Sequence, residues 1–536
     1  MRMMICTICA LLVTLAGSGV TLAQQGQQGG EEAKGGPSGE STSNPPTKPE
    51  TKPAPAPKPS EEGLSEEELK ELEGKVEEEV KVGPEVFDEG VKLYYEGNYV
   101  SAAKRLWDYM SANEQGADKY GYAEYFLALS FDKLGLSHAA MEYYYNVAKN
   151  PKKSELLPDA LSAIETITKE KPFDHDLIIK DLLYDRSFGF LRKDLRQFVE
   201  YYQGLMDYRN GFIRWGSTHF SRLPKGSYYY YKARYVQAVY SLVKYNLDEA
   251  LGIFREILAS DIDQADVVNN ARQSVARILF EQKKYKEAYD MYETINAPIE
   301  KQASVFMEEA WTQYYLKNYQ RAMGLLYSLE APSFFRYFNP EKYILKSLIY
   351  KNLCHYNVAK DAVAEFFQQY GDAVDAVYDR VDLDKNEIIL DAALQTPELV
   401  ELGRFQRLLD TELGALGDFE SAWDENGLLD HLNRIYNLKI QEVNRSLKTR
   451  LDSSLRHVAE NLLEFEEQMN LMEYEIGLAI YKRIKGTPTQ KEAKEEGIPY
   501  SDSKTYFEFD GEFWNDELHT FRFFIEDRCF SEERWE

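Results

Sequence analysis

The chain has 536 residues, with 90 acidic against 63 basic side chains and a formal net charge of −27. A chain this acidic lacks the basic surface that binds the phosphate backbone of nucleic acids. No polybasic run is placed to bind an anionic membrane surface. The length allows about three domains or one extended repeat array. With 39 tyrosines, the chain is also rich in aromatic side chains.

The first 23 residues are typical of a cleaved export signal. Met1-Arg2 is a short positive segment, Ile5–Ala16 is an apolar run too short to span a bilayer comfortably, and Thr21–Ala23 offers small residues before Gln24. We therefore expect an exported, periplasmic protein that is cleaved near Ala23 and has no transmembrane segment in its mature chain. The alternative is an uncleaved N-terminal anchor.

Two short segments follow the signal. Residues 24–62 consist largely of Gln, Gly, Ser, Glu and Pro, a composition that predicts a disordered linker because it cannot build an apolar core. Residues 63–84 predict an acidic helix, which begins with the capping box of Ser65 and Glu68. Gly83-Pro84 is expected to end that helix.

From residue 85 to 372 the chain repeats a helix-turn-helix pattern. In the first unit Gly97 turns the chain, and Tyr99, three positions before Ala102, opens the second helix. The alanine recurs after 38 residues from Ala102 to Ala140, and after 38, 34 and 37 from Ala250 through Ala288 and Ala322 to Ala359. The residues expected to pack the repeats together are Gly97, Tyr99, Ala102, Gly135, Ala140, Ala250, Tyr285, Ala288, Tyr319 and Ala322.

These residues resemble the tetratricopeptide repeat, whose unit has about 34 residues. The resemblance implies an all-α solenoid of stacked helix pairs with a concave face on which peptides or partner proteins lie. It implies binding and brings no catalytic residue. The stretch from Leu156 to Tyr231 fits the pattern only loosely.

Two features of that stretch suggest a contact with a partner. Tyr228, Tyr229, Tyr230 and Tyr231 are consecutive, so on a helix they point in all directions, and at least one pair is expected to reach solvent or a partner. Residues 181–232 are locally basic and combine arginine with aromatic residues, as interface hot spots do; Arg209, Arg214 and Trp215 are the candidates. The alternatives are core packing for the tyrosines and internal salt bridges for the arginines.

Residues 373–485 predict a helical arm. One helix is expected over 386–416, interrupted near Thr396-Pro397, and a much longer one over 427–485. The long helix carries a heptad seam of Leu455, Val458, Leu462, Phe465, Met469, Met472 and Ile476. This seam could face the preceding helix as a hairpin, pack back on the repeats, or pair with another chain; we favour the two intramolecular arrangements.

The last segment, 486–536, is an acidic tail rich in aromatic residues. Phe507 and Phe509 permit a short strand, and Phe513 and Trp514 are candidates for a partner contact. The tail is expected to cap the array or to form a landing site. Its Gly-Glu-Phe-Trp-x-Asp-Glu-Leu string, from residue 511 to 518, resembles tails of myxobacterial envelope and gliding-motility repeat proteins.

The residue types that catalysis and metal binding use form no recognisable motif in this sequence. Seven histidines make no zinc-type spacing, and Asp382-x-Asp384-x-Asn386 fails as a calcium loop because Glu387 stands where the turn needs glycine. Cys354 and Cys529 could form one disulfide. We expect no catalytic, cofactor or metal site.

The sequence thus predicts an exported, non-catalytic scaffold that binds envelope or secreted proteins and no nucleic acid. The alternative is a protein that binds or processes glycan or peptidoglycan with tyrosines in a solenoid groove. Oligomerisation stays open at this point.

Overall fold

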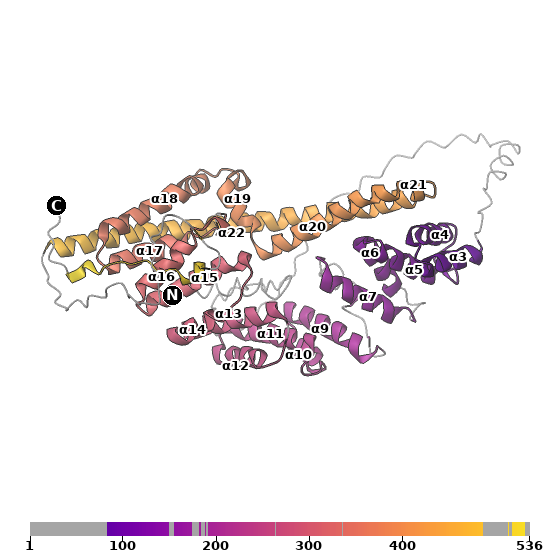
Figure 1. Cartoon of the computed structure of the whole chain (residues 1–536), viewed down its shortest axis with the longest axis horizontal. Coiled ribbons are helices and arrows are strands. Elements are labelled where there is room, and N and C mark those ends of the chain that lie inside the picture. Colours follow the sequence, from indigo (N-terminus) through magenta and orange to yellow (C-terminus); the bar gives the residue numbers. More distant parts are fainter. Residues whose placement is uncertain are drawn as a thin grey trace, which may run out of the picture.

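The computed structural model describes residues 83–149, 155–173, 182–183, 188, 191–262, 264–334, 336–485, 513 and 517–530. Over these ranges the fold is all-α, as the sequence predicts: neighbouring helices pack pairwise into a solenoid, and this part of the chain contains no strand (Figure 1). The expected signal peptide, the linker, residues 63–82 of the acidic helix, the strand at 507–509 and Trp514 lie outside the described residues.

Within the described residues, fifteen α-helices belong to the solenoid. In chain order they are α3 (Pro84–Tyr95), α4 (Tyr99–Ser111), α5 (Tyr120–Lys133), α6 (Ser137–Lys149), α7 (Leu157–Glu170), α9 (Lys193–Arg209), α10 (Ile213–Ser221), α11 (Tyr228–Val243), α12 (Leu247–Leu258), α13 (Ala265–Glu281), α14 (Tyr285–Tyr292), α15 (Ile299–Tyr315), α16 (Tyr319–Ser328), α17 (Glu341–Asn352) and α18 (Tyr356–Tyr378).

Seven helix pairs turn through one residue of left-handed conformation. In each turn the next residue donates its backbone N–H to a carbonyl five positions earlier, as from Asn98 to Leu93 at 3.0 Å, which satisfies a carbonyl at the end of the first helix. The turn residues have φ between +59° and +82°, and they are Gly97, Gly135, Gly211, Tyr245, Lys283, Lys317 and Cys354. Four of the seven are not glycine, so the glycine of the first two units is not a general rule of this repeat.

The repeat register also extends through the stretch that fits the sequence pattern loosely. Gly211 lies 76 positions after Gly135, which is twice the 38 that separate Gly97 and Gly135. The helices α9 and α10 pack as a regular pair, joined by the same turn. The expectation of a loose fit there is therefore wrong for this pair.

The predicted packing residues lie where the helices meet. The five alanines among these predicted packing residues are fully buried; they are Ala102, Ala140, Ala250, Ala288 and Ala322. The tyrosines that open the second helices contact aromatic rings at the ends of the first helices in tilted or edge-to-face geometry. The pairs are Tyr99 with Tyr94, Tyr285 with Phe280 and Tyr319 with Tyr314, with centroids 5.3–5.7 Å apart.

After the solenoid the chain forms the arm. It consists of α19 (Glu387–Leu394), α20 (Pro397–Ala415), the short α21 (Glu420–Trp423) and α22 (Leu428–Ile484). Short 3-10 turns lie at Pro332–Phe334, Leu383–Lys385, Leu416–Phe419, Leu518–Thr520 and Arg528–Phe530. The predicted interruption at Thr396-Pro397 is confirmed, because α20 begins at Pro397. With 57 residues, α22 is about 85 Å long.

The heptad seam of α22 packs within the chain. Six of its seven residues are buried, Phe465 is half-buried, and they join the hydrophobic cluster of α15 to α19. The contacts of this seam come from α17, α18 and α19, so it mainly packs back on the repeats. Of the preceding helix expected over 386–416, the part that forms α19 therefore packs on the seam, whereas α20 packs on the N-terminal half of α22, where Gln406 donates to Asn444 at 3.0 Å.

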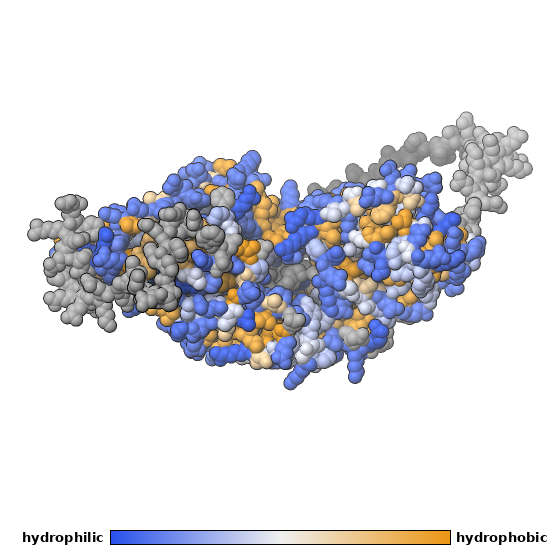
Figure 2. Space-filling view, in the orientation of Figure 1, coloured by the Kyte–Doolittle hydropathy of each residue, from blue (hydrophilic) through white to orange (hydrophobic). Residues whose placement is uncertain are grey.

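The arm also returns to the first repeats. Trp423 is fully buried and donates its Nε1–H to the Val100 carbonyl of α4 at 3.0 Å, and Trp107 of α4 donates to the Asn426 carbonyl at 3.0 Å. The helix α22 therefore spans from α6 to α17 and α18 and closes the arch of the solenoid (Figure 1). Figure 2 shows hydrophobic residues gathered where α20 and α21 lie by α4 to α6.

The C-terminal segment 517–530 lies across α16. Leu518 is buried, the Phe523 N–H donates to the Gln320 carbonyl at 3.0 Å, and the Phe523 ring stacks on Tyr327. A disulfide joins Cys529 to Cys354 at the α17–α18 turn, with 4.9 Å between the Cα atoms. The pairing that the sequence allowed is thus present, and this part of the tail covers the array.

Candidate partner-binding surface

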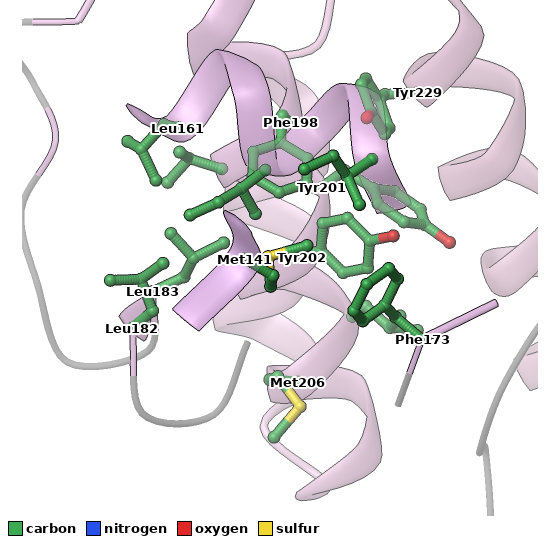
Figure 3. Packing of buried hydrophobic residues seen from close by; sticks show 14 of the residues in the cluster. Met141, Leu161, Phe173, Leu182, Leu183, Phe198, Tyr201, Tyr202, Met206 and Tyr229 are labelled. Carbon is green, nitrogen blue, oxygen red and sulfur yellow. The ribbon is translucent and has the colours of Figure 1, made fainter. Parts of the chain in front are cut away.

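The four consecutive tyrosines open α11, where the Ser227 side chain accepts the Tyr230 N–H at 3.2 Å and caps the helix. Tyr229 points into the core beside Phe198, Tyr201 and Tyr202 (Figure 3), and its hydroxyl donates to Glu165 at 2.9 Å. Tyr229 is therefore a packing residue and is closed to any partner.

The other three tyrosines are half-buried and engaged. Tyr230 donates its hydroxyl to Glu256 at 2.6 Å, and the Tyr231 ring lies 5.3 Å from that of Tyr230. Lys232 donates to the Tyr228 hydroxyl at 3.3 Å and also lies over its ring. None of the four belongs to the well-exposed aromatic residues of the chain, so most of this cluster serves packing.

The helix α10, which precedes α11 in the chain, presents a different surface. Gly211 turns the chain with φ +81°, and after it Phe212 is 55% exposed and Trp215 is 71% exposed. Arg214 lies exposed between them in sequence, and no ion pair of the described residues includes it. We call Phe212, Arg214 and Trp215 the α10 patch.

The patch stands on a rigid support. The helices α9 and α10 approach so closely that a Cβ on Gly204 would lie 2.6 Å from the Phe220 ring, and one on Gly216 would lie 2.4 Å from the Tyr208 ring. Both aromatic side chains are buried. Because the buried face of α10 packs this closely on α9, the backbone that carries the α10 patch has a fixed position on the helix pair.

An ionic network also anchors the end of α10. His219 Nδ1 lies 2.6 Å from Glu200 Oε2, and Arg222 donates to the same carboxylate at 3.1 Å. Burial alone would raise the pKa of Glu200, but the hydrogen bond from His219 and the charge of Arg222 hold it below its usual range. Arg222 thus forms a salt bridge within the chain. The candidate Arg209 is half-buried, and its guanidinium contacts Met206 Sδ at 3.8 Å.

Phe212 was missing from the candidates chosen by sequence, and the residues at the same position of the other pairs give no clear signal for it. It is the residue just before the second helix of its pair, where three other pairs have an asparagine; those residues are Asn98, Asn246 and Asn318. A phenylalanine there offers no side-chain acceptor for the free N–H groups of the helix. Of the three asparagines, however, only Asn98 accepts a helix N–H with its side chain, and the matching residue before α6 is the apolar Leu136. The fold, and not the residue type at this position, therefore reveals the exposure of Phe212.

Other exposed aromatic residues lie at the corresponding turns. They are Tyr95 before Gly97, Tyr245 at its own left-handed turn, and Tyr315 before Lys317. Because the solenoid repeats one turn geometry, these residues mark one edge of the array. The α10 patch places two exposed aromatic residues and an exposed arginine within four consecutive positions on this edge.

The two candidates from the tail do not join this patch. Phe513 is half-buried and packs with Phe521 in the cluster of α15 to α19, whereas α10 belongs to the other hydrophobic cluster. Trp514 lies outside the described residues. The sequence candidates therefore separate into core tyrosines, a tail contact and the α10 patch.

Across the parts of the chain that the structure describes, no group of three or more His, Cys, Asp or Glu side chains is arranged to hold a metal ion. Within the same residues, no helix is long and apolar enough to cross a membrane. No protein-family model and no curated protein matches this chain.

Proposed function

We propose that this chain is an exported, non-catalytic scaffold that binds envelope or secreted proteins through the α10 patch. The observation that carries the proposal is the exposure of Trp215 and Phe212 around an unpaired Arg214 on a tightly packed helix pair. Tryptophan and arginine are the residues that most often dominate protein interfaces. The fold adds support, since solenoids present extended binding surfaces.

The chemistry of the patch defines the partner segment that fits it. Two exposed rings favour an apolar side chain, and the Arg214 guanidinium favours a carboxylate placed beside it. Arg222 is engaged by Glu200 within the chain, whereas no ion pair of the described residues includes Arg214, so Arg214 is the candidate to select the partner. We therefore expect the partner to present an apolar residue flanked by an acidic one.

Photo-crosslinking in the producing cell tests this function. A photoreactive amino acid replaces Trp215, and the matched control replaces Leu438, which is exposed and apolar on the distant α22. We expect a discrete adduct with an envelope or secreted protein from position 215 only, lost when Arg214→Glu is added. Equal adducts from both positions, or an adduct indifferent to Arg214→Glu, would contradict the proposal.

The glycan alternative gives a different result in the same cells. An exposed tryptophan also stacks on sugar rings, so retention on peptidoglycan that depends on Trp215, with no protein adduct, would favour it. With the purified protein partner, Trp215→Ala should weaken binding by on the order of 30-fold or more.

Export is tested separately by the N-terminus of the protein recovered from cells. We expect it to begin near Gln24 and to be found outside the cytoplasm. An intact Met1 on cytosolic protein would contradict export without bearing on the α10 patch.

A further inference from the structure

A second apolar stripe runs along the C-terminal part of α22. Leu471, Tyr474, Leu478 and Tyr481 follow one another at spacings of three, four and three, and they are between 38% and 64% exposed. We call these four residues the outer stripe. Scattered exposed apolar residues are common on protein surfaces, but a run at heptad spacing is the pattern of a helix that meets another helix.

The outer stripe lies opposite the buried seam of the same helix. It repeats that seam two residues later, with Leu471 after Met469, Tyr474 after Met472 and Leu478 after Ile476. Two residues correspond to about 200° around an α-helix. Since the buried seam packs on α17 and α18, beside which this half of α22 lies (Figure 1), the outer stripe faces away from them.

Charged residues continue the stripe at both ends in the same heptad register. Glu467 stands four positions before Leu471, and Lys485 stands four positions after Tyr481. Both side chains are exposed. The full row thus has an acidic end, four apolar positions that alternate Leu and Tyr, and a basic end.

We propose that the outer stripe pairs with the same stripe of a second copy of this chain, antiparallel about a two-fold axis near Ile476. In this register Leu471 meets Tyr481 of the partner subunit, and Tyr474 meets Leu478 of the partner subunit. Glu467 meets Lys485 of the partner subunit at each end. Every position therefore faces a complementary one, as an isologous contact requires.

Other registers lose this complementarity. A parallel pair would place Glu467 against Glu467 of the partner subunit and Lys485 against Lys485 of the partner subunit, and like charges across a helix pair are unfavourable. An antiparallel pair shifted by one heptad sets Glu467 against Leu478 of the partner subunit, and the opposite shift sets Lys485 against Tyr474 of the partner subunit. The charges at the ends select one register.

The size of the contact sets its strength. Four apolar layers bury less than the roughly 800 Å² per partner of a standard stable interface. The association should therefore be reversible and should depend on protein concentration. It is independent of the α10 patch, which lies on another element.

Sedimentation of the full exported chain over a range of concentrations tests the pairing. We expect a monomer–dimer equilibrium that Leu471→Asp weakens by on the order of 100-fold, because two apolar layers of the symmetric contact are lost together. The control, Leu438→Asp, alters an equally exposed leucine of the same helix and should leave the dimer unchanged. A monomer at every concentration, or a dimer that withstands Leu471→Asp, overturns the proposal.

Charge exchange tests the register. Glu467→Lys and Lys485→Glu should each weaken the dimer, and the two variants mixed should form the heterodimer in preference to either homodimer. The chain with both substitutions should dimerise like the original. If neither single substitution changes the dimer, the antiparallel register is wrong.

Discussion

The smallest residues of this fold set the distance between its helices. Ala288 has no exposed surface, and it lies in the first turn of α14, three residues after Tyr285. Any larger side chain there must displace a neighbouring helix. The same position holds an alanine in five other pairs, and this recurrence explains why the sequence pattern predicted the register; the five are Ala102, Ala140, Ala250, Ala322 and Ala359.

Ala288→Asp should therefore cost the protein about 2–4 kcal/mol of unfolding free energy, because a carboxylate would be buried without a partner. Thermal unfolding measures the loss. Lys286→Asp introduces the same side chain at an exposed position of α14 and is expected to change little. An unchanged melting temperature for Ala288→Asp would contradict the packing assigned to this alanine.

A buried carboxyl gives the fold a pH dependence. Burial raises the pKa of Glu124 to about 7 from its usual value near 4.5. The folded state therefore holds this proton more tightly than the unfolded state, so the contribution of Glu124 to stability is fully present below about pH 4.5 and is lost as pH rises from about 4.5 to 7.

Glu124→Gln should abolish this pH-dependent contribution to stability, because glutamine does not titrate. Relative to the wild type, the variant should gain stability as pH rises across that window, by roughly 2–3 kcal/mol in total. Chemical denaturation of both proteins at pH 5 and pH 8 measures the difference. A constant gap between the two proteins would show that Glu124 titrates normally.

At the scale of elements, α22 is the feature that local sequence determines best. The expected range of 427–485 and the helix Leu428–Ile484 agree to within a residue at each end. Gly427 sets the start with a left-handed φ of +73°, and the heptad spacing is visible in any short window. Patterns of this kind depend on neighbours in sequence and can be identified without the fold.

The non-glycine turns could not be identified in the same way. Tyr245, Lys283, Lys317 and Cys354 adopt positive φ, which costs free energy for residues with a Cβ and is normally assigned to glycine. The packing of the two helices imposes this conformation, so sequence alone has no signal for it. The α10 patch was identified in part, because Arg214 and Trp215 fit a hot-spot composition while the fold decides their exposure.

Replacing Leu462 and Met469 with Asp tests the buried seam of α22. Both residues are fully buried against the cluster of α15 to α19, so the double variant should lower the melting temperature steeply. Leu438→Asp serves as the control: because Leu438 is an exposed residue of the same helix, we expect almost no effect on the melting temperature. Equal melting temperatures for the double variant and the wild type would place the seam at an intermolecular contact.

At the scale of the whole molecule, one buried carboxylate of the arm is among the contacts that close the arch. Glu412 of α20 accepts the backbone N–H groups of Ser137 and His138 at 3.0 and 2.9 Å, and the Tyr436 hydroxyl at 2.7 Å. A carboxylate at the N-terminus of α6 satisfies free amide donors and opposes the positive end of the helix dipole. These partners lie up to 275 positions apart, which is why no local pattern predicted the closure.

Glu412→Ala should therefore open the arch at this end while the repeats stay folded, since each helix pair is stabilised mainly by its neighbours. Hydrogen exchange reports this directly: the Ser137 and His138 amides lose their acceptor and should exchange at least about tenfold faster, with α13 to α16 unchanged. Gln406→Ala removes an exposed hydrogen bond to Asn444 within the same hairpin and serves as the control. If the α6 amides stay protected in Glu412→Ala, the contacts of Trp423 and Trp107 hold the closure without this carboxylate.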